Sequence, residues 1–243
     1  LNVTVNPDSK AYLLSCHTLK TNHTKVARFV NDSLWLLWPH GKGENLNIFY
    51  TGAAPYMIKT AEAMKVFYPN LLHVTCLAHE LNRVAEEGQN SHPLVNDVLS
   101  AIKKFILKAP AQRATYEDDM PGVPLLPESI VTRWGTWLGT VEFYGSYLDD
   151  ITHVVNMFNT ERSVTMRATQ TLLNYCRLPT DVQLVVAHFT FLGHTVRKLE
   201  IRGLTLTESP GTVSSVRNKL AQVFTPMGQK ITKKMDSVLK KNS

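Results

Sequence analysis

The sequence has few cysteines and no long apolar run. Its cysteines are three in number and far apart, at Cys16, Cys76 and Cys176. An odd, scattered set argues against a disulfide framework and fits a reducing compartment. No apolar run approaches the roughly 18 to 20 residues that a membrane-spanning helix needs. We therefore expect neither a disulfide-stapled secreted domain nor a membrane protein.

The common local signatures of catalysis are also missing. The sequence contains no phosphate-binding loop of the Walker type and no local arrangement of Ser, His and Asp or of Cys and His. Paired acids occur at Glu86-Glu87 and Asp149-Asp150, but neighbouring residues on a helix do not face each other. These acids are typical of surface charge, and they indicate no acid–base site.

Charge is distributed unevenly along the 243 residues. The net charge is +6, and the segment from Arg197 onward contains ten basic and three acidic residues, so the rest of the chain is nearly neutral. A basic terminal segment can contact nucleic acid, with Lys233 and Lys234 as candidates. The alternative is a solvated helical face, which general charge patterns favour.

The first 76 residues show the pattern of an α/β fold. Strands are predicted over Asn2–Val5, Ala11–Leu19, Leu46–Tyr50 and Leu71–Cys76, and helices over Thr24–Trp38 and Ala54–Phe67. Asn22 or Thr21 could cap the first helix, and Pro55 suits the first turn of the second.

From Leu77 onward the pattern becomes helical. Helical spacing covers 77–87, 93–107, 141–158, 164–175, 180–202, 212–224 and 227–241. The longest irregular piece is Asp118–Ser129, which contains three prolines and is long enough for a functional loop or a linker. We predict two domains, 1–76 and 77–243: an α/β unit followed by an all-α unit.

Two strand-to-helix junctions contain candidate site residues. In Thr51-Gly52-Ala53-Ala54-Pro55, the residue at the tip is a glycine, and by itself it indicates a simple turn. Cys76 and His79 follow the last strand, three residues apart. They supply half of a tetrahedral zinc site, but no second closely spaced pair exists, and His73 and His92 are near only in sequence. The spacing therefore favours a buried cysteine and a histidine that orders the helix start.

An aromatic stripe follows the proline-rich segment. Trp134, Trp137, Leu138, Val141 and Tyr144 share one helical face, and Arg133 precedes the first of them. Such stripes usually form helix-packing core. An arginine beside a tryptophan can also stack on nucleobases, which makes Arg133 and Trp134 candidates for nucleic-acid binding.

Three stretches together resemble the hAT-superfamily transposases. They are "FYTGAAPYMIKTAEAMKVFYPNLLHVTCLAHELNRVAE", "VNDVLSAIKKFILKAP" and "VTRWGTWLGTVEFY". Cys76 and His79 match the CxxH element of that family, and Thr132-Arg133-Trp134 matches its RW element. The resemblance implies an RNase H-like catalytic core, followed by a helical insertion domain.

The resemblance also implies that Gly52 replaces a catalytic residue. In the family the turn at this position usually reads Thr-Asp-Ala, and its aspartate is the second of three acids that hold Mg²⁺ or Mn²⁺. Here a glycine stands in that place. The resemblance places the first acid on a strand before Leu1, in the centre of the sheet, and the third acid beyond Ser243. None of the three acids is then expected in the chain, so we expect no catalysis and no metal cofactor.

The expected function is that of a degenerate, transposable-element-derived pseudoenzyme. We expect a catalytically inactive hAT transposase-like domain with a partial RNase H-like mixed sheet, acting in the nucleus through DNA or chromatin binding. The alternatives are a helical module that binds protein partners without a nucleic-acid role, and an incomplete portion of an active DNA transposase.

Overall fold

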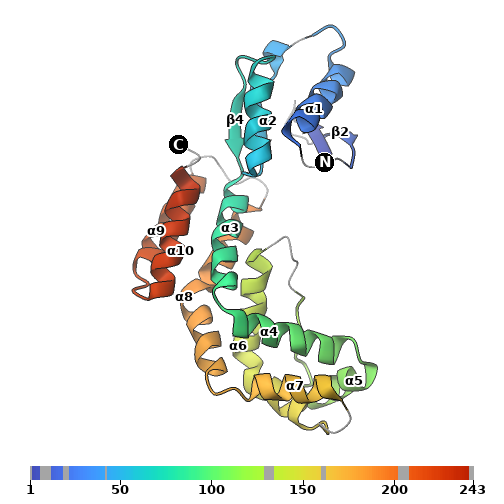
Figure 1. Cartoon of the computed structure of the whole chain (residues 1–243), viewed down its shortest axis with the longest axis vertical. Helices are drawn as coiled ribbons and strands as arrows, with labels where there is room; N and C mark the ends of the chain where they lie inside the picture. Colours follow the sequence, from blue (N-terminus) through green and yellow to red (C-terminus); the bar gives the residue numbers. More distant parts are fainter. Residues whose placement is uncertain are drawn as a thin grey trace. The chain divides into compact units, whose positions relative to one another are not determined.

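The computed structural model describes residues 2–5, 12–18, 22–41, 43–128, 134–159, 163–201 and 208–240 (Figure 1). The chain divides into two units, one running to Glu80 and the other beginning at Leu81. This division lies inside helix α3 (Leu77–Asn90), four residues after the domain boundary that the sequence predicts.

The strands of the first unit form two separate sheets. β1 (Asn2–Val5) and β2 (Tyr12–Cys16) pair antiparallel, and their register shifts between Val3 and Thr4. β3 (Ile48–Thr51) and β4 (Leu72–Thr75) pair parallel. Among the described residues each sheet has two strands, so the single mixed sheet expected from the sequence does not form. The reason is that no described segment pairs with both β1 and β3.

Two helices and a short 3₁₀ turn, η1 (Gly43–Asn45), complete this unit. α1 (His23–Leu37) begins at the predicted cap, where the Asn22 side chain accepts a hydrogen bond from the backbone N–H of Thr24 at 2.9 Å. α2 (Pro55–Lys65) starts with the proline that the sequence predicts there. Both helices bury one apolar stripe in a shared core formed by Val3, Val26, Val30, Leu34, Met57, Met64, Tyr68 and Leu71.

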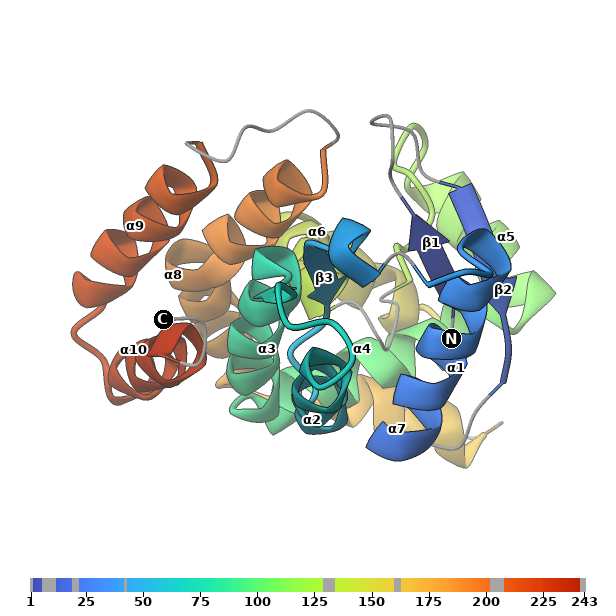
Figure 2. The ribbon, with the colours of Figure 1, turned by 90° about the horizontal axis from the view of Figure 1, so that it is seen from above.

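The second unit is helical, as predicted. After α3 come α4 (Pro93–Ile102), the π-helical turn η2 (Lys103–Leu107), α5 (Pro110–Asp119), α6 (Trp134–Asn156), α7 (Val164–Leu173), α8 (Leu178–Leu199), α9 (Glu208–Ala221) and α10 (Pro226–Leu239) (Figure 2). α5 was not predicted, and α6 begins seven residues before the expected Val141. No helix among the described residues is long and apolar enough to cross a bilayer.

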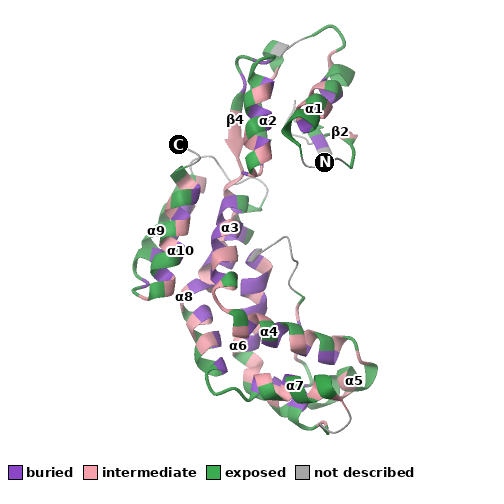
Figure 3. Cartoon of the chain, viewed as in Figure 1, coloured by how far each residue is buried: buried purple, intermediate pink, exposed green. Residues whose placement is uncertain are grey.

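The core of the helical unit lies along α6 and α8. Trp137, Leu138, Val141 and Tyr144 are all buried, so these four residues of the aromatic stripe are core residues. Figure 3 colours the buried parts of α6 purple. The two helices approach closely because glycines line their contact. A Cβ on Gly193 would lie 3.0 Å from the backbone oxygen of Gly135. Any larger residue at that position would push the helices apart.

Candidate functional site

Several polar side chains of the first unit lie at or near the carboxyl ends of its two parallel strands. Thr51 and Thr75 face each other at the strand ends, and the N–H of Cys76 donates to the Thr51 carbonyl at 2.9 Å. α2 and α3 both begin within a few residues of this point. Ligands of α/β sheets bind at such strand ends. We call this region the strand-end cluster, formed by Tyr50, Thr51, Gly52, His73, Cys76 and His79.

A hydrogen-bonded pair joins the two strands inside this cluster. The Thr51 hydroxyl donates to the backbone oxygen of Gly52 at 2.9 Å and lies 2.8 Å from Nε2 of His73. The contact between the Thr51 hydroxyl and Nε2 of His73 is a hydrogen bond that links the two strands. Burial, and to a smaller extent the positive charge of Lys65, lowers the pKa of His73. The imidazole is therefore held neutral at physiological pH.

Gly52 lies beside His79. A Cβ built on Gly52 would lie 3.4 Å from Cδ2 of the His79 ring, an ordinary van der Waals distance. The glycines with positive φ in the described chain are Gly41 and Gly122, so the backbone at Gly52 does not require a glycine. A side chain at position 52 would thus fit and would point toward His79.

Tyr50 and Cys76 meet next to this pair. Tyr50 is 61% exposed as a residue, yet its hydroxyl lies close enough to Cys76 to interact with it. Burial of the hydroxyl end, followed by the contact with Cys76, raises the pKa of Tyr50. The phenol therefore stays protonated at neutral pH and acts as a neutral hydrogen-bonding group.

One buried acid in this region escaped the sequence analysis. Glu80 lies in the first turn of α3, where its N–H donates to the Cys76 carbonyl, and its surface is fully buried. A glutamate is almost never buried in this way unless it interacts with other groups. A signal existed in the sequence, because Glu80 falls on the same helical face as Leu77, Leu81 and Val84.

The metal-binding prospects of the cluster are limited. In the described part of the chain, no three His, Cys, Asp or Glu side chains come together as a metal site. The two histidines near Cys76 and His79 in sequence have other partners. His73 bonds Thr51, and Nδ1 of His92 lies 2.7 Å from the Gly88 carbonyl.

The start of α6 carries the predicted RW element. Thr132 and Arg133 lie outside the described residues. Trp134 is the first residue of α6. The next residue, Gly135, is bound by a residue that is distant in sequence. Its backbone N–H donates to the Asn82 side chain on α3 at 2.9 Å. This bond satisfies one of the free N–H groups that every helix start exposes.

Most of the basic C-terminal segment lies on α9 and α10, side by side in Figures 1 and 2. Lys233 is exposed. Lys230 and Lys234 lie 2.7 Å and 3.7 Å from the Glu87 carboxylate of α3, and the hydrogen bond from Lys230 lowers the pKa of Glu87. Basic side chains outnumber acidic ones in this hairpin: Arg217, Lys219, Lys230, Lys233, Lys234 and Lys240 stand against Glu208 and Asp236.

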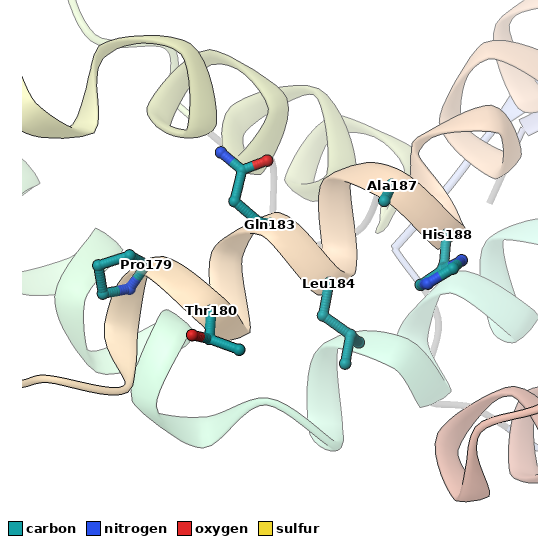
Figure 4. Close-up of a pocket in the computed structure, with 6 residues that line it drawn as sticks. All are labelled: Pro179, Thr180, Gln183, Leu184, Ala187 and His188. Atoms are coloured by element: carbon teal, nitrogen blue, oxygen red, sulfur yellow. The ribbon is translucent and has the colours of Figure 1, made fainter.

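A shallow depression follows one face of α8. Figure 4 shows its lining residues, all from this helix: Pro179, Thr180, Gln183, Leu184, Ala187 and His188. A face of one helix offers no convergent set of polar groups, which a specific ligand site needs. The depression therefore adds no candidate chemistry.

Comparisons with protein-family models, with curated proteins and with solved structures find no match for this chain.

Proposed function

We propose that the chain is a catalytically inactive, transposase-derived domain that binds nucleic acid in the nucleus. The observation that carries this proposal is Gly52. It follows a strand end beside His79, with room for a side chain, at the position where the hAT resemblance expects a catalytic aspartate. A glycine offers no carboxylate oxygen to a divalent cation.

In this proposal the first unit is an RNase H-like core. The order β1, β2, α1, β3, α2, β4, with an antiparallel pair followed by a parallel pair, supports the assignment. The resemblance implies one further strand in the centre of the sheet. Among the described residues no strand lies between β1 and β3, and the strands form two sheets of two, as expected if the central strand is not among them.

The basic hairpin supports the nucleic-acid role. Lys233 and Lys240 are exposed on α10 and at its C-terminal cap, and Lys219 and Arg217 are exposed on α9. Lysines and arginines bind the phosphate backbone and release its counterions, which gives affinity without sequence readout. The expected partner is thus DNA bound through its backbone.

The test is a titration of a fluorescein-labelled DNA duplex with the full 243-residue chain, followed by fluorescence anisotropy between low and physiological salt. Binding should weaken steeply as salt rises, with a linear fall of log K against log salt concentration. Lack of binding at low salt, or binding that ignores salt, would contradict the proposal.

A second function, a protein-interaction module, is favoured by a different observation. Of the fifteen large hydrophobic side chains that the described residues expose, ten lie in the first unit. Exposed apolar side chains mark protein-binding sites where they form a contiguous patch, and Trp35, Leu36 and Leu37 are consecutive in the chain. Recovery of a stoichiometric protein partner that survives nuclease treatment would support this function, and recovery of none would oppose it.

A further inference from the structure

The turn between α9 and α10 carries the most exposed large hydrophobic side chain in the described part of the chain. This side chain belongs to Phe224, which is 88% exposed. The turn joins two helices of the second unit that lie side by side (Figures 1 and 2). Single hydrophobic residues are common on protein surfaces, so exposure alone assigns no role to Phe224. Two further features distinguish it: the rigidity of the turn and the charge of the helices on either side.

Both neighbours of Phe224 are held in place. Val223 is 7% exposed, and its N–H donates to the Leu220 carbonyl at 3.0 Å. Thr225 caps α10, because its hydroxyl accepts a hydrogen bond from the N–H of Gly228 at 2.9 Å. Gly228 packs so closely against Val223 that a Cβ there would overlap the Val223 carbonyl oxygen. The turn therefore presents the exposed ring on a fixed backbone, and a partner does not have to order it on binding.

The helices on either side of this ring are positively charged. Residues 217–234 span the turn and contain five basic residues and no acidic residue. Two acids outside this segment pair with it. Glu87, on α3, lies 2.7 Å from Lys230, and Asp236, on α10, pairs with Arg217. Five basic residues against these two acids leave a positively charged surface, which attracts anionic partners.

An exposed ring on a positively charged surface fits a nucleic acid. Phosphates supply the negative charge, and every base has a flat aromatic face on which a phenyl ring can stack. Insertion of the ring into an intact duplex would first have to unstack paired bases, and one stacking contact yields free energy of only the same order as that cost. An unpaired base stacks without this cost. The complementary partner therefore has an unpaired base next to a charged backbone.

A membrane surface is a less suitable anionic partner. Helices that bind a membrane surface insert a row of apolar side chains into it. The apolar residues Ile231, Met235 and Val238 of α10 are buried in the helical unit, so this helix has no such row to offer. Phe224 stands alone at the turn, which suits a contact with a single base.

We propose that Phe224 stacks on an unpaired base of DNA, while basic side chains of α9 and α10 bind the phosphate backbone next to it. The preferred partner is then a duplex with a single-stranded tail, and a blunt duplex binds more weakly. This inference rests on the first proposed function, nucleic-acid binding, and names the form of DNA that the chain prefers. It assigns no base sequence, because a phenyl ring can stack on any base.

The experiment measures DNA affinities of the full 243-residue chain by fluorescence anisotropy at low salt. The probes are three fluorescein-labelled duplexes of one sequence: one with blunt ends, one with an oligothymidine tail and one with an abasic tail of the same length. The abasic tail keeps the phosphates and lacks the bases. The parent chain should bind the thymidine tail at least about tenfold more tightly than the abasic tail, as expected for one base-stacking contact.

Variants of Phe224 test whether the ring is responsible. Phe224→Ala should lose the preference for the thymidine tail and keep the affinity for the blunt duplex. Phe224→Trp should keep the preference, because an indole also stacks, whereas Phe224→Leu should lose it. Val164→Ala is the matched control, since Val164 is 83% exposed at the start of α7 in the same unit. Circular dichroism checks that each variant folds, as the exposure of both residues predicts.

The outcomes separate this site from the broader proposal. If the parent chain binds all three probes equally, or if Phe224→Ala keeps the preference, the stacking role is wrong and DNA binding stands. If Phe224→Leu matches the parent chain, the contact is apolar and the stacking role is again wrong. If the parent chain binds no probe at low salt, nucleic-acid binding itself is contradicted. Phe224-dependent binding to vesicles of phosphatidylcholine and phosphatidylserine, or to a protein partner that survives nuclease treatment, in place of the tailed duplex, would also overturn the proposal.

Discussion

Nζ of Lys230 lies 2.7 Å from Oε1 of Glu87, so an ion pair connects α10 to α3 within the helical unit. Lys234 lies 3.7 Å from the other oxygen of the same carboxylate. The Glu87 side chain is mostly buried, whereas that of Lys230 is largely exposed. One carboxylate therefore partly neutralises two lysines of the basic segment, so this contact lowers the positive charge that the segment presents.

Replacement of Glu87 should change stability in a pH-dependent way. Its pKa lies below the ordinary value in the folded protein, chiefly because Lys230 donates a hydrogen bond to it. The contribution to the free energy of unfolding is then present above the ordinary carboxyl pKa of about 4.3 and is lost as the pH falls through the lower folded value. At pH 7, Glu87→Gln should lower the free energy of unfolding by about 0.5–1 kcal/mol.

Urea unfolding at pH 7 and at pH 3 measures this effect, and the difference between parent and variant should shrink at pH 3. The neighbouring Glu86→Gln is the control, since no ion pair of Glu86 occurs among the described residues. An equal loss of stability at both pH values would show that the ion pair is not responsible.

The same contact predicts opposite effects of two variants on DNA binding. Lys233→Ala removes an exposed positive charge, so the slope of log K against log salt should become shallower by about 0.9. Glu87→Gln frees Lys230 and Lys234 from their carboxylate, so affinity at low salt should rise. Lys104→Ala, an exposed lysine on η2, is the control. An unchanged salt slope for Lys233→Ala together with an unchanged low-salt affinity for Glu87→Gln would exclude the α10 face as the DNA-binding surface.

Gly52→Asp should fold and should not cleave DNA. A side chain at this position makes only an ordinary contact with His79, so the fold should tolerate it. The resemblance implies three metal-binding acids, and this substitution restores one of them. Incubation of supercoiled plasmid with the variant and Mg²⁺ or Mn²⁺ is the measurement, with Gly52→Ala as the control. Metal-dependent nicking by the aspartate variant alone would contradict the assignment of position 52.

Gly228→Ala should destabilise the helical unit, although Gly→Ala usually favours a helix. A Cβ on Gly228 would overlap the backbone oxygen of Val223 and would lie 2.6 Å from Cγ1 of that residue. We expect a loss of about 1–3 kcal/mol in the free energy of unfolding. Gly52→Ala is the control and should be neutral or slightly stabilising. Thermal unfolding, followed by circular dichroism, compares Gly228→Ala with Gly52→Ala. Similar melting temperatures of the two variants would argue against the close contact between position 228 and Val223.

Asn82→Ala should weaken the start of α6. The variant removes the acceptor for the buried N–H of Gly135, and an unsatisfied buried donor costs about 1–3 kcal/mol. Hydrogen exchange of the first turn of α6 should accelerate, while exchange in α9 and α10 should not. Asn90→Ala, an exposed residue at the end of α3, is the control. Unchanged protection of Gly135 would show that another group holds the helix start.

The elements that the sequence predicted well are those with a strong local pattern. α1 has both a capping asparagine and a regular apolar stripe, and it begins within one residue of the prediction. α5 has neither a capping side chain nor an apolar stripe, since Tyr116 is its only buried residue. The sequence therefore did not predict this helix. α6 was predicted to start at Val141, although the stripe that begins at Trp134 already had helical spacing; the bond that Gly135 makes to Asn82, 53 residues earlier in the chain, could not be predicted from local pattern.

The candidate site shows the same limit. The sequence indicated Gly52, Cys76 and His79 by motif, and the structure places Gly52 against His79. Nothing in the sequence indicated that Thr51 would bond His73 across two strands. That bond depends on which strand pairs with which, and hydrogen bonds between strands join residues that are distant in sequence. The burial of Glu80 was missed although Glu80 falls on the apolar face of its helix.

The sequence by itself determined the change from an α/β unit to a helical unit, because helical and strand periodicities are local properties of the chain. It also determined the charge of the last segment, which is a matter of composition. Tertiary structure alone decided that the strands form two sheets and that Glu87 binds two of the lysines. Each of these depends on contacts between residues far apart in the chain, which arise only when the core packs.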